Sequence, residues 1–183
     1  MKKKYLSYFS FIVLVFITSC NKESPNTAMK FSLGDENKIC IYLADQLENG
    51  KDLVLKEKLV DFDEIIGYDP KTYIFLVNDI AAERIRNNWN KYTTYSVGGA
   101  SFVVTASDEI VYDGLIMTPI SSCLVTNKIC FSPFVEEDKI ELELGYPRTF
   151  SFNGTDSRND TRLISILERF NKIRTIIPAN RGY

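Results

Sequence analysis

Histidine is absent from this chain of 183 residues. Without an imidazole, the chain cannot form the usual histidine-based serine or cysteine hydrolase sites, the paired-histidine zinc protease motif, or nearly any zinc or haem site. A glycine-rich phosphate loop and a dinucleotide fingerprint are also missing, because Gly98 and Gly99 have neither a third glycine nor a helix directly behind them. We therefore expect no metal and no cofactor, and the sequence favours a protein that is not an enzyme.

Runs of positive charge are missing as well. The chain has 22 Lys and Arg against 24 Asp and Glu, a net charge of −2. Removal of residues 1–19 would take away three lysines and no acidic residue, which makes the net charge −5. Basic residues such as Arg84 and Arg86 fall on predicted helices, where solvated helix faces explain them. An acidic chain of this kind is a poor partner for nucleic acid, and we expect none.

Long hydrophobic runs are limited to one, at the N-terminus. Lys2–Lys4 precede a nearly uninterrupted apolar segment, Tyr5–Ile17. The segment is shorter than the ~20 residues that a membrane-spanning helix needs, so it is typical of an export signal. It ends in Ile17-Thr18-Ser19-Cys20, which resembles the lipobox of bacterial lipoproteins. A secretory signal with an incidental cysteine is the alternative.

The lipoprotein resemblance implies a role for each residue around the cleavage site. Ser19 would precede the cut, and the sulfur of Cys20 would carry a diacylglyceryl group, with palmitate-type chains holding the protein at the membrane. Two or more acyl chains anchor a protein stably. Asn21 stands where an inner-membrane retention signal would place aspartate. The resemblance therefore implies a lipid-anchored protein of the cell envelope, at the outer membrane, facing the periplasm or the cell surface.

The rest of the chain divides into a tether, a domain and a tail. Residues 20–38 include Pro25 and Gly34 and show no sustained period, which predicts a flexible tether. Residues 39–177 are long enough for a single domain with a real core, and residues 178–183 form a C-terminal tail.

The predicted domain centres on a hairpin. Ala100–Thr105 and Ile110–Ile116 are rich in β-branched and aromatic residues and flank four small or polar ones. In Ile140–Leu144, apolar residues alternate with Glu141 and Glu143, which predicts an edge or half-exposed strand. The fold class that follows is α+β, a mostly antiparallel sheet with two or three helices packed on one face, ferredoxin-like in arrangement. The other predicted strands are Ile39–Leu43, Tyr73–Val77 and Phe150–Phe152.

Three helices are predicted from their capping residues. Asp61 and Glu64 have the spacing of a capping box, which predicts a short helix over Asp61–Gly67. The other two are Ile80 to about Asn90, capped by Asn78-Asp79, and Thr161–Ile173, capped by Asp160. The stripe expected to pack on the sheet from the second helix is Ile80, Ala81, Ile85 and Trp89.

The three cysteines other than Cys20 leave two readings open. If Val125–Lys128 is the turn of a second hairpin, Cys123 and Cys130 face each other at a spacing slightly wider than a relaxed disulfide prefers. An envelope compartment is often oxidising, which would favour a bridge. Buried free thiols are the alternative. Cys40 is expected to pack in the core of the first strand.

Residues 61–131 resemble the head subdomain of the first periplasmic domain of SecD, the export motor subunit. The corresponding pieces are Phe62–Ile65, Tyr73–Val77, Ile80–Ile85, Gly99–Val104, Ile110–Gly114 and Pro119–Ser121. The resemblance implies an α+β sandwich and a head that meets an extended peptide or another envelope protein. It implies no motor function, because the membrane helices of SecD are missing.

Candidate chemistry is limited to carboxylates and aromatic side chains. Acid clusters at turns and helix starts could supply acid and base groups, although caps and solvated loops explain them as well. Asp156–Asp160 could offer oxygen ligands to calcium or could simply cap a helix. Aromatic residues near turns suit contact with protein or glycan, or else cap the edge of the core. The acid clusters are Asp61, Asp63 and Glu64; Asp108, Glu109 and Asp113; and Glu136, Glu137 and Asp138. The aromatic residues are Tyr68, Tyr92, Tyr95, Tyr112, Tyr146 and Trp89.

Together these features predict a lipid-anchored envelope protein whose domain is a non-catalytic binding or accessory module. One alternative is a carboxylate-dependent envelope hydrolase, for which Asp113, Glu137 and Asp156 are the residues to substitute. The other is an inhibitor or immunity-type lipoprotein, with which the acidic surface is compatible. The expected partners are the membrane, through the lipid anchor, and another envelope protein or an extended peptide.

Overall fold

The computed structural model describes residues 38–46, 53–88, 98–107, 109–134, 138–148 and 151–178. Several predicted features lie outside these ranges. They are the signal peptide with Ser19, the lipidation residue Cys20, the tether up to residue 37, and the tail beyond Pro178. No helix in the described ranges combines the length and apolar character needed to cross a bilayer.

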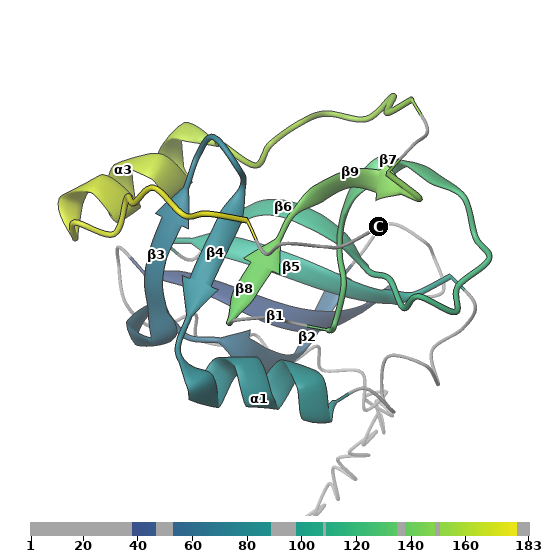
Figure 1. Cartoon of the computed structure of the whole chain (residues 1–183), viewed down its shortest axis with the longest axis horizontal. Helices are drawn as coiled ribbons and strands as arrows, with labels where there is room; N and C mark the ends of the chain where they lie inside the picture. Colours follow the sequence, from purple (N-terminus) through teal and green to yellow (C-terminus); the bar gives the residue numbers. More distant parts are fainter. Residues whose placement is uncertain are drawn as a thin grey trace, which may run out of the picture.

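Nine strands in the described residues form two sheets (Figure 1). The pairs are antiparallel except for the parallel pair of β6 and β7. The six-stranded sheet has the order β2-β1-β5-β6-β7-β9, formed by β2 (Leu53–Val60), β1 (Ile39–Gln46), β5 (Ala100–Ala106), β6 (Glu109–Ile116), β7 (Val125–Phe131) and β9 (Glu143–Tyr146). The three-stranded sheet has the order β3-β4-β8, formed by β3 (Ile65–Asp69), β4 (Ile74–Val77) and β8 (Lys139–Glu141). The predicted α+β class with mostly antiparallel strands is confirmed.

The central hairpin is confirmed as β5 paired with β6. Phe102 lies opposite Gly114, and a Cβ on Gly114 would lie 2.4 Å from the Phe102 ring and 2.2 Å from the carbonyl oxygen of Ile129. Only glycine leaves room there for both the ring and the neighbouring strand. The ring of Phe102 then packs edge-to-face on Phe131, at a centroid distance of 4.8 Å.

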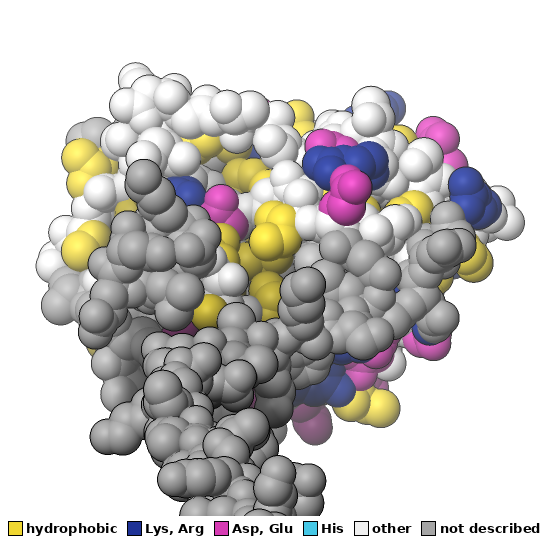
Figure 2. Space-filling model, turned by 180° about the vertical axis from the view of Figure 1, so that it is seen from behind, with side chains coloured by type: hydrophobic (Ala, Val, Ile, Leu, Met, Phe, Trp, Pro, Cys, Tyr) yellow, Lys and Arg dark blue, Asp and Glu magenta, His cyan; other side chains and the backbone are white. Residues whose placement is uncertain are grey.

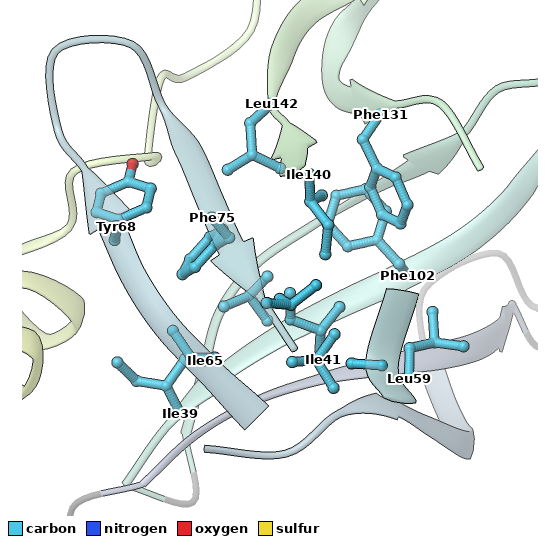
Figure 3. Close-up of a cluster of buried hydrophobic side chains, with 14 of the residues drawn as sticks. Ile39, Ile41, Leu59, Ile65, Tyr68, Phe75, Phe102, Phe131, Ile140 and Leu142 are labelled. Carbon is cyan, nitrogen blue, oxygen red and sulfur yellow. The ribbon is translucent and has the colours of Figure 1, made fainter. Parts of the chain in front are cut away.

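One hydrophobic core joins the two sheets and both helices. Ile39 and Ile41 of β1 lie in one cluster with Phe75 and Ile140 of the small sheet (Figure 3), and Leu43 belongs to the same cluster. Both helices contribute to this cluster and therefore pack on one side of the large sheet, as predicted. Their core residues are Ala81, Ala82 and Ile85 of α1 (Asp79–Asn87), and Leu163, Ile166 and Leu167 of α3 (Thr161–Arg169).

Helix α1 faces the core with a narrower stripe than predicted. Its N-cap is Asn78, whose side chain accepts from the N–H of Ala81, as expected. Ile80 is 64% exposed, so its prediction as a core residue is wrong. Ala82, which was not predicted, joins Ala81 and Ile85 on the buried face. Trp89 lies outside the described residues.

The capping box at Asp61 and Glu64 is confirmed, but the helix behind it is only the 3₁₀ turn η1 (Phe62–Glu64). The chain continues as β3 because its backbone bonds to β4, so the predicted helix end at Gly67 is wrong. The last helix also ends early, at Arg169, since Asn171 has a left-handed φ of 54° that turns the chain. The following segment runs beside β3, where Tyr68 bonds through its N–H to the carbonyl oxygen of Lys172 and through its carbonyl oxygen to the N–H of Arg174.

Two strand predictions are corrected by pairing between distant segments. Val125–Lys128 is not a turn but the first part of β7, which pairs with β6 and β9. Ile140–Leu144 is not one strand but two, β8 and β9, one in each sheet, although both are edge strands as predicted. Ser151–Asn153 has no strand structure, while Phe150 lies outside the described residues.

The order of elements also differs from the β-α-β-β-α-β order of a ferredoxin-like unit, because four strands precede α1.

Two tyrosines expected near turns and strand ends are core residues instead. Tyr68 is 0% exposed, and its hydroxyl donates to the carbonyl oxygen of Arg158 at 2.8 Å. Tyr112 is 6% exposed, and its hydroxyl has no hydrogen-bond partner in the described part of the chain. Burial raises the pKa of both phenols. Neither residue is available for an exposed aromatic patch.

The two hydroxyls form a matched pair for mutagenesis. Tyr68→Phe removes a satisfied buried hydrogen bond and should lower the free energy of unfolding by about 1–2 kcal/mol. Tyr112→Phe removes an unpaired buried hydroxyl, so it should leave the free energy of unfolding unchanged or raise it by about 1 kcal/mol. Denaturant unfolding followed by circular dichroism measures both. Equal losses in the two variants would contradict this assignment.

Candidate functional site

The chain passes from one sheet to the other at Leu142. β8 pairs with β4 in the small sheet, and β9 pairs with β7 in the large one. Leu142 is 2% exposed, so both of its backbone polar groups need partners inside the protein. Its N–H donates to the carbonyl oxygen of Tyr73 at 3.0 Å, and its carbonyl oxygen accepts from Nη1 of Arg158 at 3.0 Å. Arg158 thus gives the carbonyl of the crossing residue a donor from outside both sheets.

The guanidinium of Arg158 is buried, with a residue exposure of 7%. Its Nε and Nη2 donate to the two carboxylate oxygens of Asp156 at 2.9 and 2.8 Å, a bidentate pair. The guanidinium carbon lies 3.5 Å from the centroid of the Tyr73 ring. The hydrogen bonds from Arg158 hold the pKa of Asp156 below its ordinary value, so the pair stays ionised. The ion pair, the aromatic face and the Leu142 carbonyl together compensate for the burial of the cation.

A cavity of about 540 Å³ opens beside this crossing, and we call it the junction pocket. One wall is the turn between β3 and β4, and the other is the segment that joins β8 to β9. Leu142, Leu144 and Phe152 give it an apolar part, while charged side chains surround the rest. The residues of the two walls are Lys71–Tyr73 and Glu141–Leu144, and Arg148, Phe152, Arg158 and Pro178 complete the lining.

Two exposed cations line the pocket. The side chain of Arg148 is 64% exposed and reaches Oε1 of Glu141 at 3.3 Å, while the side chain of Glu141 is only 16% exposed. Lys71 is exposed on the opposite turn, and its ammonium pairs with no acidic side chain in the described ranges. Positive charge therefore lies next to an apolar surface in this pocket.

The turn that carries Lys71 is held by Asp69, which is 3% exposed. Its carboxylate accepts from the N–H of Lys71 at 2.9 Å and from the N–H of Ile176 at 2.8 Å. Burial alone would raise the pKa of Asp69, but these hydrogen bonds outweigh it and lower the pKa. Tyr73 closes the turn with a φ of 58°, a left-handed conformation that is rare for an aromatic residue. The contacts of Tyr73 with Arg158 and Leu142 hold it there.

The described acidic residues that the sequence singles out serve mainly as caps and ion-pair partners. Glu64 pairs with Arg84 at 2.7 Å, and hydrogen bonds from Arg84 lower its pKa. Burial would raise the pKa of Asp61, but hydrogen bonds from Lys58 and the N–H of Phe62 lower it. The other ion pairs are Asp113 with Lys128, Asp138 with Arg86, and Glu109 and Asp160 with Arg162. Asp63 is exposed, and Asp108, Glu136 and Glu137 lie outside the described residues.

On the face shown in Figure 2, positive and negative side chains lie next to each other rather than in separate patches. Asp156 and Asp160 each form an ion pair with the arginine two residues later, so the two carboxylates contact arginines and do not face each other across a calcium site. In the described ranges, no group of three or more carboxylates or thiols is placed to hold a metal ion.

The three cysteines of the domain are free thiols in the structure. Cys130 is buried in a small cluster with Met117 and Val125, and Cys123 packs against this cluster. A second cavity, of about 180 Å³, lies beside Cys130. Burial and, to a lesser degree, Glu143 raise the pKa of Cys130 to about 12, and burial raises that of Cys40. The turn that would have set Cys123 opposite Cys130 does not form, so the geometric argument for a bridge no longer applies, and the disulfide stays a prediction.

Sequence reasoning missed the junction pocket because none of its residues forms a local motif. Arg158 reads as one more helix-proximal arginine, and Lys71 as part of an ordinary turn. The one signal in the sequence is the repeat Asp156-Ser157-Arg158 and Asp160-Thr161-Arg162, two aspartate-arginine pairs of equal spacing. The structure buries the arginine of the first pair and leaves the arginine of the second exposed.

These two pairs provide a test of the buried arginine. Arg158→Met should lower the free energy of unfolding by about 1–3 kcal/mol, because the buried Leu142 carbonyl loses its donor. Arg162→Met, at the exposed pair, should change it little. Urea unfolding of both variants measures the difference. If both variants lost a similar free energy of unfolding, the buried contacts of Arg158 would add no more stability than the exposed ion pair of Arg162.

Comparison of this chain with models of protein families, with curated proteins and with solved structures gives no match. The lipoprotein signal and the likeness to the SecD head therefore remain predictions from the residues themselves. The junction pocket is described by its own geometry alone.

Proposed function

We propose that this protein is a lipid-anchored component of the cell envelope whose α+β domain is a non-catalytic binding or accessory module. The observation that carries the proposal is the N-terminal order of three lysines, an apolar segment of signal-peptide length, and Ile17-Thr18-Ser19-Cys20. Acylation of Cys20 would hold the domain at a membrane through residues 20–38.

The arrangement of charged groups in the domain supports a binding role. The carboxylates proposed as catalytic in the alternative reading include Asp113 and Asp156, and these pair with Lys128 and Arg158. A general acid needs a raised pKa, whereas the pKa of Asp156 is lowered. The junction pocket, in contrast, combines exposed cations with an apolar wall. Such a cavity recognises ligands by charge and shape without a reacting group.

Substitution of the lipobox cysteine tests the anchor. Cys20→Ser should remove the thiol that accepts the diacylglyceryl group, so the full chain should carry no acyl chains. Intact mass spectrometry should show the loss of the acyl chains and, because the signal peptidase of lipoproteins requires lipidation, retention of residues 1–19. Cys40→Ser is the matched control and should leave acylation unchanged. A mass in the Cys20→Ser variant that differs from the unsubstituted protein only by the cysteine-to-serine change would contradict the proposal.

A further inference from the structure

We infer that the junction pocket binds a peptide that carries a carboxylate beside an apolar side chain. The carboxylate contacts Lys71 and Arg148, and the apolar side chain packs on Leu144 and Phe152. This inference rests on the proposed role as a binding module and names the ligand of that module.

The charges around the pocket favour an anionic group. The charge of Arg158 is neutralised by Asp156, and that of Arg148 is partly neutralised by Glu141 at 3.3 Å. Glu143 lines both this pocket and the second cavity. Lys71 remains without an acidic partner in the described part of the chain. Lys71 is therefore the cation of the lining with which an incoming carboxylate can pair.

Hydrogen-bond donors are also in place for this group. Arg148 makes one ion-pair contact and has five N–H donors, and its side chain is 64% exposed. Arg158 makes three donations, to Asp156 and Leu142, which leaves one N–H on each terminal nitrogen. Lys71 adds an ammonium with three donors. Carboxylate oxygens accept from such groups in charge-assisted hydrogen bonds.

The size and lining of the pocket favour a peptide over a small inorganic anion. A cavity of about 540 Å³ is in the range that takes an organic ligand. Leu144 and Phe152 form an apolar wall that phosphate would leave unused. The other wall, Glu141–Leu144, belongs to β8, the crossing residue and β9, and both strands are edge strands of their sheets.

Two labelled peptides test the assignment with the full lipidated protein in detergent micelles. The first is fluorescein-Leu-Glu-Leu-Glu with an amidated C-terminus, and the second is fluorescein-Leu-Gln-Leu-Gln with an amidated C-terminus, which has the same shape and dye without the side-chain carboxylates. Fluorescence anisotropy, corrected for binding to empty micelles, should show at least about tenfold tighter binding of the Glu peptide. The preference should shrink as salt is raised from about 0.05 to 0.5 M, because exposed charges are screened.

The double variant Lys71→Gln/Arg148→Gln should remove the preference for the Glu peptide. Arg86→Gln is the matched control, since Arg86 also makes an exposed ion pair, at 3.4 Å to Asp138, but lies outside the pocket. All three substituted side chains, at Lys71, Arg148 and Arg86, are exposed. Thermal melting checks that the variants remain folded. Equal affinity for the two peptides, no binding of the Glu peptide, or a preference that survives in the double variant would each overturn the inference.

Inorganic phosphate at matched ionic strength is the competing anion. It should not displace the Glu peptide, because it makes no use of the apolar wall. Displacement would mark a general anion site and overturn the peptide assignment. Peptide binding is measured apart from acylation, so failure of this inference is distinguishable from failure of the lipid anchor.

Discussion

The structure depends on the hydrogen bonds that the buried backbone N–H and carbonyl oxygen of Leu142 make. At this residue the chain leaves one sheet for the other. A strand that crosses between sheets loses its regular neighbours at the crossing, and unpaired backbone groups are costly in the interior. Tyr73 accepts from the Leu142 N–H, and Arg158 donates to the Leu142 carbonyl oxygen. The same two residues stack on each other. Because the crossing also forms a wall of the junction pocket, the contacts that hold the sheets together also shape the pocket.

Much of the local structure can be predicted from the sequence because it depends on residues close together in the chain. The capping box at Asp61 and Glu64 and the caps at Asn78 and Asp160 follow from side chains that bond to nearby N–H groups. The β5–β6 hairpin follows from two strand-forming runs around a short polar turn. The alternation in Ile140–Leu144 correctly indicates edge strands. These features were enough to predict the α+β class.

Features that depend on distant partners could not be predicted in this way. Val125–Lys128 reads as a turn, but its pairing with β6 and β9 makes it strand. Nothing local shows that Leu142 divides its strand between two sheets, or that Arg158 is buried while Arg162 is exposed. Tyr68 reads as a residue near a turn, yet the segment after α3 covers β3 and leaves it 0% exposed. The junction pocket was missed for the same reason, because its walls are about 70 residues apart in the chain.

Native-state hydrogen exchange of the Leu142 amide tests the central role of this crossing most directly. If the N–H of Leu142 is held in the core by Tyr73, it should exchange as slowly as the amide of Phe102 in the central strand β5, through global unfolding. Exchange at the rate of an exposed loop amide would show that the two sheets are not joined rigidly at Leu142, and would contradict the account.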